Sequence, residues 1–551
     1  MGFPTKVQLI KRKDSEQWYI NFPSALAQAM EFERGETVEW VIEDKSQLVL
    51  RRRAVPATTL KKNESRASLM SAWHNLFDAS RPAFAQHRTF ERARGLGLSA
   101  LACLGRRTLS GLLCASGQQF HDWSAAYRLF EQERLDPAQL WTSLRHRLFD
   151  QLPSSGPVVA LMDDTLRRKR GKHVSGTSWR RDPLGPPFAN NFIWASRFLQ
   201  LSIALPEHPE QATSSARAIP VDLQHAPSPR KPSKKASQEM WDAWRAASAL
   251  ATVSGLGAQR IAALRRDLDT HPGGTSRRLL VCVDGTFTCR AVFRELPERT
   301  TLIGRIRKDA NFHALPTAEQ ENHGRGRQRR YAQRLPTPEQ YRQDSSIPWQ
   351  NVRACAAGNT CDFEIKTIAP LRWKTAGGDR QLLLLIIRPV AYRLKQGADL
   401  NYRKPAYLIC TDPTLPPEQI LQAYLWRWEI EVNFRDEKTL LGFGEPQVRT
   451  EASVRTTAAF FVFAYALLLL ALHQCQLAHT PLPPPRWQRR KPKRPQQRVS
   501  TPQAISMLRA CLWSSALGLS NKNGFAMINP TTAKPPQIQF ALKSAVLYAT
   551  G

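Results

Sequence analysis

The sequence has no pair of cysteines at the Cys-x2-Cys spacing, although it contains nine cysteines. Because that number is odd and the pairs are missing, we expect neither a zinc site nor a framework of disulfides. The N-terminus also lacks the pattern of a secretory signal peptide. These absences predict a protein of a reducing compartment, and we expect a cytoplasmic location.

Long uncharged segments are scarce as well. The longest runs from Thr456 to Leu472 and contains the letters FFVFAYALLLLAL, between Arg455 and His473. Its 17 residues reach only the lower limit for a membrane span. We therefore predict a buried core helix and no membrane partner.

Acidic residues are few in comparison with basic ones. The chain has 46 Asp and Glu against 79 Lys and Arg, which gives a net charge of +33. Since 42% of the residues are hydrophobic, this is a folded basic protein and not a disordered basic tail. The excess recurs in many segments, which favours nucleic acid as the partner. A ribosomal-type or membrane-surface protein is the alternative class.

Two apolar runs that end in aspartate are the first candidates for chemistry. Residues 157–162 form an uninterrupted apolar segment before Asp163 and Asp164, and residues 279–283 precede Asp284 in the same way. Such runs predict strands buried on both faces. Because successive strand residues point to opposite sides, only one of Asp163 and Asp164 can face a given site.

A third carboxylate lies on a predicted helix. Tyr424, Arg427, Glu431 and Lys438 stand at relative positions 0, 3, 7 and 14, which places all four on one narrow helix face. Such a row suits a site for phosphate and metal, whereas an Arg427–Glu431 salt bridge is the simpler interpretation. Two distant strand-end aspartates favour the site, and carboxylates without Cys or His favour Mg2+.

The helix matches the signature Y-x2-R-x3-E-x6-K, which resembles that of bacterial insertion-sequence transposases of the DDE superfamily. In that resemblance Asp164, followed by threonine as in the family, is the first carboxylate and Asp163 the fallback; Asp284 and Glu431 complete the set. The resemblance implies two bound Mg2+ ions, which Mn2+ can replace. It also implies a set of DNA-binding side chains: Tyr424, Arg427, Lys438, Arg305, Arg307, Lys308 and Arg449.

The implied fold is α/β: a ribonuclease H-like mixed sheet flanked by helices. We expect a catalytic core at 153–475 with a β-rich insertion at about 310–412, after a helical segment at 67–152. That segment is either a DNA-binding domain or a packing scaffold. A basic linker and a last helix fill 476–551, and residues 206–236 are expected to form an exposed basic loop.

Residues 1–53 form a further module. Strands are expected near Val7–Ile10, Gln17–Ile20, Thr37–Ile42 and Gln47–Leu50, with a short helix at Ala25–Met30. The run from Ile20 to Val38 resembles the AbrB-like swapped-hairpin DNA-binding domain, which implies dimerisation and DNA contact. A β-rich cap without a DNA role is the alternative.

The resemblance implies a bacterial, nucleoid-associated enzyme that acts on double-stranded DNA. It would cleave at terminal inverted repeats and join the ends to target DNA, as a homodimer assembled on DNA. A nuclease with the same core but no strand transfer is one alternative. A DNA-binding regulator with an inactive core and a structural nucleic-acid-binding protein are the others.

Overall fold

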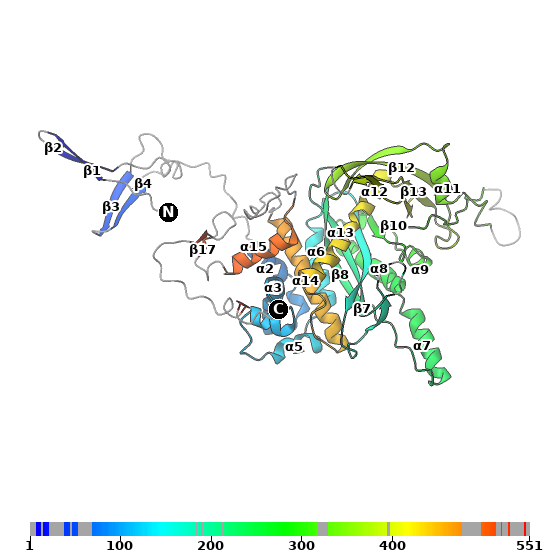
Figure 1. Cartoon of the computed structure of the whole chain (residues 1–551), viewed down its shortest axis with the longest axis horizontal. Coiled ribbons are helices and arrows are strands. Elements are labelled where there is room, and N and C mark those ends of the chain that lie inside the picture. The colour runs from blue at the N-terminus through cyan, green and yellow to red at the C-terminus, as the bar shows by residue number, and fades with distance from the viewer. Residues whose placement is uncertain are drawn as a thin grey trace. The chain divides into compact units, whose positions relative to one another are not determined.

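The computed structural model of the chain divides into two compact units, Met1–Arg66 and Ala67–Gly551 (Figure 1). It describes residues 7–12, 15–20, 38–44, 47–52, 69–182, 185–186, 188, 191–211, 213–317, 329–393, 397–475, 498–513, 519–520, 527–528 and 545–546.

The first unit contains two antiparallel hairpins. One pairs β1 (Val7–Arg12) with β2 (Ser15–Ile20), and the other pairs β3 (Val38–Asp44) with β4 (Gln47–Arg52). The four predicted strands are therefore present. The predicted helix at Ala25–Met30 lies outside the described residues.

The second unit is built on a mixed sheet whose central strands have the order β8-β7-β5-β9-β10. Strand β5 pairs with β7 antiparallel and with β9 parallel, and β10 is parallel to β9. The bounds are β5 Val158–Arg168, β7 Phe192–Pro206, β8 Ala216–His225, β9 Leu279–Val283 and β10 Thr300–Arg305. This arrangement confirms the predicted α/β class and is consistent with a ribonuclease H-like fold.

The β-rich segment before the glutamate helix extends this same sheet. Its strands add to the β10 edge in the order β16, β13, β12 and β11, while β6 closes the opposite edge beside β7. The bounds are β6 Ser178–Arg181, β11 Gln350–Ala356, β12 Asn359–Leu371, β13 Leu382–Ile387 and β16 Ala406–Cys410. Two small hairpins complete the strands: β14 Ala391–Arg393 with β15 Leu400–Tyr402, and β17 Leu519–Ser520 with β18 Met527–Ile528.

Strand β8 corrects the expectation of an exposed loop at 206–236. Most of Ala216–His225 is buried, and the strand pairs with β7 along its length. Pro220 is tolerated because β8 is paired on one side only, and the register with β7 shifts next to it. The prolines and basic residues of this segment favoured a loop in the sequence, where the structure has a buried strand.

One face of the sheet is covered by α8 (Val253–Thr270) and by the apolar helix α14 (Glu451–Gln474). Helix α14 lies between β8 and the N-terminal helices α2, α3, α5 and α6, so helices and sheet share one core (Figure 1). Among the described residues it is the one helix long and apolar enough for a membrane span, but 94% of that apolar window is buried. The prediction of a buried core helix is confirmed.

The remaining helices of the second unit have the following bounds. They are α2 Leu69–Asp78, α3 His87–Ala102, α4 Leu109–Ala115, α5 Ser124–Glu131, α6 Pro137–Phe149, α7 Gln238–Leu250, α9 Arg290–Arg294, α11 Pro338–Gln343 and α15 Thr501–Trp513, with 3-10 turns η1 Arg81–Ala83 and η2 Gly274–Ser276.

Helices α12 (Pro417–Trp426) and α13 (Trp428–Thr439) cover the other face of the sheet. Their buried residues, such as Ile420 and Ile430, pack in one cluster with Leu161 of β5 and Cys282 of β9. The helix pair that carries the Tyr, Arg, Glu and Lys signature therefore lies directly over the two strands that carry the aspartates.

Candidate active site

The apolar run suggested that strand β5 ends at its aspartates, but the strand is longer. It continues to Arg168, because β7 stays paired with it as far as Ala195 opposite Arg168. The parallel partner β9 stops earlier, at Val283 opposite Met162. Beyond Met162, β5 pairs with a strand on one side only, and both aspartates lie in this part of the strand.

The two adjacent aspartates face opposite sides of the sheet. Leu161 belongs to the cluster under α12 and α13, whereas Met162 belongs to the cluster around α8 and α14. By alternation Asp163 follows the face of Leu161 and Asp164 that of Met162. Their partners agree: Asp163 binds an arginine of the helix pair, while Asp164 forms an ion pair with Arg197, whose Nε lies 2.8 Å from its Oδ2.

Asp284 follows the last residue of β9 and lies close to Asp163. Its carboxylate accepts hydrogen bonds from the backbone N–H and the hydroxyl of Thr286, at 2.9 and 3.0 Å. Burial, together with the negative charge of Asp284, raises the pKa of Asp163 to about 7. Burial also raises the pKa of Asp164, where Arg197 opposes the effect.

The signature helix is interrupted at Arg427, which corrects the prediction of one continuous helix. Here the N–H of Arg427 donates to the carbonyl of Tyr424 at 3.1 Å, and the N–H of Ile430 donates to the carbonyl of Arg427 at 3.1 Å. These are i to i+3 bonds, which tighten the chain locally. Tyr424 thus lies in α12, Glu431 and Lys438 lie in α13, and Arg427 lies at the junction of the two helices.

Arg427 joins two of the candidate carboxylates. Its Nη1 donates to Asp163 at 3.0 Å and its Nη2 donates to Glu431 at 2.8 Å. Its side chain is only 14% exposed. Burial alone would lower the pKa of Arg427, but the neighbouring Tyr424, Asp163 and Glu431 outweigh it and raise that pKa. The guanidinium is therefore a fixed positive charge between the carboxylates.

Two more predicted DNA-binding residues lie beside this cluster. The ring of Tyr424 is 5.7 Å from the guanidinium carbon of Arg427. Burial raises the pKa of Tyr424, and the charges of Arg427 and of Arg305 at the end of β10 oppose this rise. All three residues line one groove of about 1200 Å³. The structure thus gathers Asp163, Glu431 and these three side chains at one place.

The other predicted DNA-binding residues lie elsewhere. Lys438 is two turns beyond Glu431, with Arg168 and Asp182 as charged neighbours. Arg307 pairs with Asp309 at 2.9 Å, and Lys308 is exposed next to it. Arg449 is exposed in the connection from α13 to α14, where its carbonyl accepts from the N–H of Ser175.

Two residues near the site were not predicted. Arg197 is the only charged residue in the apolar run of β7, and that isolation was a signal that could have been used. Glu437 of α13 is 1% exposed, and burial raises its pKa to about 8. Nothing in the sequence distinguishes Glu437 from the half-buried acids Glu429 and Glu431 of the same helix.

The donor set fits a hard divalent cation. Asp163, Asp284 and Glu431 offer only carboxylate oxygens, which suit Mg2+ or Mn2+ better than zinc. In the part of the chain that the structure describes, no three His, Cys, Asp or Glu side chains stand close enough to hold an ion. The guanidinium of Arg427 lies between two of the three carboxylates and binds both of them.

Comparison with known protein families gives a match over most of the N-terminal helices and part of the sheet. A search of curated proteins finds no relative of this chain. The sequence model of a family described as DDE superfamily endonuclease matches residues 81–368, which include helices α3 to α6, β5 and β9 but not α2 or the helix pair with Glu431. Because this match covers more than half of the chain, the protein belongs to the DDE superfamily endonucleases.

Proposed function

We propose that this endonuclease is a DNA transposase, which cleaves at the ends of a mobile element and joins them to target DNA. The observation that carries the proposal is the bridge from Arg427 to Asp163 and Glu431, with the carboxylate of Asp284 close enough to act on Asp163. This bridge brings the signature helices onto the aspartates of β5 and β9.

We assign the catalytic carboxylates as Asp163, Asp284 and Glu431. This replaces Asp164 by its neighbour, because Asp164 follows the opposite face and is neutralised by Arg197. Divalent ions held by these carboxylates would activate the attacking water or 3′-hydroxyl and stabilise the leaving oxygen.

The cations beside the carboxylates would bind the scissile phosphate. Arg427 has a planar guanidinium suited to two parallel hydrogen bonds, and Arg305 extends the positive charge along the groove. The phenol of Tyr424 can donate a further hydrogen bond to a phosphate oxygen. Lys438, Arg307, Lys308 and Arg449 lie farther away and would contact more distant phosphates of the duplex.

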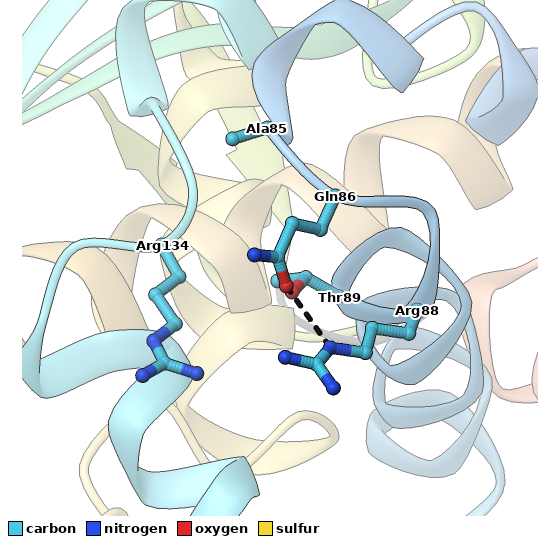
Figure 2. Close-up of a pocket in the computed structure, with 5 residues that line it drawn as sticks. All are labelled: Ala85, Gln86, Arg88, Thr89 and Arg134. Carbon is cyan, nitrogen blue, oxygen red and sulfur yellow. Dashed lines mark hydrogen bonds between the residues drawn. The ribbon is translucent and has the colours of Figure 1, made fainter.

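The N-terminal helices offer a separate place for DNA. Figure 2 shows the guanidinium groups of Arg88 and Arg134 reaching into one small pocket, with the side chain of Gln86 between them. Arg88 donates to Gln86 at 3.0 Å, and Arg134 donates to Gln132 at 2.7 Å. Since these partners are neutral amides, both cations keep their charge available for phosphates of the DNA backbone.

The hairpins β1–β2 and β3–β4 are proposed to act as an AbrB-like module for DNA binding and dimerisation. The working form would be a homodimer assembled on DNA in the bacterial cytoplasm, associated with the nucleoid. The strongest competing function is a nuclease that cuts and does not join. A DNA-binding regulator is the other, and metal-dependent cleavage separates it from both enzymes.

The test uses the DNA that flanks this reading frame, placed on either side of a marker and incubated with Mg2+ and a target plasmid. We expect cut ends and joined products from the natural protein. Asp284→Asn and Glu431→Gln should give neither, while their DNA affinity in a gel-shift assay stays close to that of the natural protein. Cleavage without joined DNA would identify a nuclease, and cleavage that survives in both variants would exclude the assigned site.

A further inference from the structure

Arg427 occupies the place that a cation would take between Asp163 and Glu431. We infer that in the DNA-free protein this guanidinium stands in for the metal, and that a DNA phosphate must draw it away before metal binds tightly. Metal binding and DNA binding would then be cooperative. The inference rests on the proposed function, because it needs the same carboxylates to bind the ion.

Competition for the same oxygen atoms is the first step. Arg427 donates to Oδ2 of Asp163 and to Oε1 of Glu431, and so occupies one oxygen of each carboxylate that an ion shared by the two would use. A divalent cation next to a guanidinium also meets a like charge in a partly buried site. Metal and guanidinium therefore exclude one another at this position.

The displaced guanidinium needs another anion, which is the second step. The side chain of Arg427 is mostly buried, and its Nε has no hydrogen-bond partner in the described part of the chain. Leaving such a charge unpaired is costly. The groove that Arg427 lines with Arg305 and Tyr424 would bring a phosphate within its reach.

The backbone at Arg427 suits such a movement, which is the third step. The residue lies at the junction of α12 and α13, where i to i+3 bonds replace the regular helical ones. A shift of this residue does not require either helix to unwind. DNA that pairs with Arg427 then frees the carboxylates, and by reciprocity bound metal strengthens DNA binding by the same factor.

The test measures Mn2+ binding by the full-length protein with electron paramagnetic resonance, without DNA and with a duplex of random sequence whose own Mn2+ uptake is subtracted. Arg427→Gln should bind Mn2+ about tenfold more tightly than the natural protein when DNA is absent. DNA should strengthen Mn2+ binding of the natural protein and have much less effect on this variant. Arg427→Lys has a single ammonium, which cannot bridge both carboxylates in the same way. Its Mn2+ affinity without DNA should lie between those of the natural protein and Arg427→Gln.

Arg197→Gln is the matched control, because it removes an equal charge from the neighbouring Asp164 on the other face. Its Mn2+ affinity should change much less than that of Arg427→Gln. Equal or weaker Mn2+ binding by DNA-free Arg427→Gln overturns the inference. If that variant does not fold, as judged by circular dichroism, Mn2+ binding by Arg427→Lys equal to that of the natural protein overturns it.

The inference and the proposed function can fail separately. One outcome is that DNA cleavage depends on Asp163 while the Mn2+ affinity does not change on mutation of Arg427. That result would support the proposed function and contradict the coupling of metal binding to DNA binding. Absence of Mn2+ binding from both the natural protein and Arg427→Gln, with and without DNA, would remove both.

Discussion

Replacing Glu437 by glutamine should make the protein more stable, and by an amount that grows with pH. Glu437 is buried in α13, and neither of its carboxyl oxygens accepts a hydrogen bond from another described residue. Gln200 of β7 lies beside it with its own carbonyl oxygen unpaired. A protonated Glu437 can donate to that oxygen, and an amide at the same position can do so as well.

The magnitude follows from the pKa of Glu437, which burial raises from its ordinary 4.5 to about 8. Between these values the folded protein holds a proton that the unfolded chain has released. A raised pKa gives stability that is complete below 4.5 and is lost as the pH rises through about 8. At about 1.4 kcal/mol per pH unit, the loss amounts to about 5 kcal/mol across this window. Glutamine has no titrating proton, so Glu437→Gln does not lose stability in this way.

The assay compares urea unfolding of the natural protein and Glu437→Gln, followed by circular dichroism at several values between about pH 5 and pH 9. The advantage of the variant should widen up to about pH 8 and then level off, because above the pKa of Glu437 both the folded and the unfolded chain have released the proton. Glu418→Gln, at an exposed position of α12, provides the control and should show no such widening. A difference between natural protein and Glu437→Gln that stays constant with pH would refute the reasoning.

Three further predictions concern the site, the DNA contact and the end of α13. Asp163→Asn should reduce DNA cleavage at least about a hundredfold and Asp164→Asn much less, and the reverse order in a cleavage assay would return the first carboxylate to Asp164. The double variant Arg88→Ala with Arg134→Ala should weaken DNA binding and lower the slope of log affinity against log salt concentration by about 2. The same double change at Arg94 and Arg128, which form salt bridges, should lower this slope less. Equal slopes for the two double variants would contradict the proposed contact. Gly442→Ala should lower the free energy of unfolding by about 1 kcal/mol or more, because Gly442 has φ of +59° and an added Cβ would meet Glu445; an unchanged urea midpoint would speak against this.

The sequence by itself determined the elements of the site. The apolar runs before Asp163 and Asp284 are long enough and uniform enough to be buried strands, and β5 and β9 are found there. The signature around Glu431 required a helical segment, and the uncharged run at Thr456–Leu472 required a buried helix. These features follow from local periodicity and burial, which short stretches of sequence express directly.

Only the tertiary structure decided how these elements meet. Whether Asp163 or Asp164 faces the helix pair depends on how the neighbouring strands and helices cover β5, because alternation alone assigns the two residues to opposite faces without saying which face is which. The bond of Arg427 to Asp163 of β5 and the position of Glu437 beside Gln200 of β7 join residues that lie more than two hundred positions apart in the chain. Such contacts leave no periodic trace in the sequence, since they arise only when distant segments pack against one another.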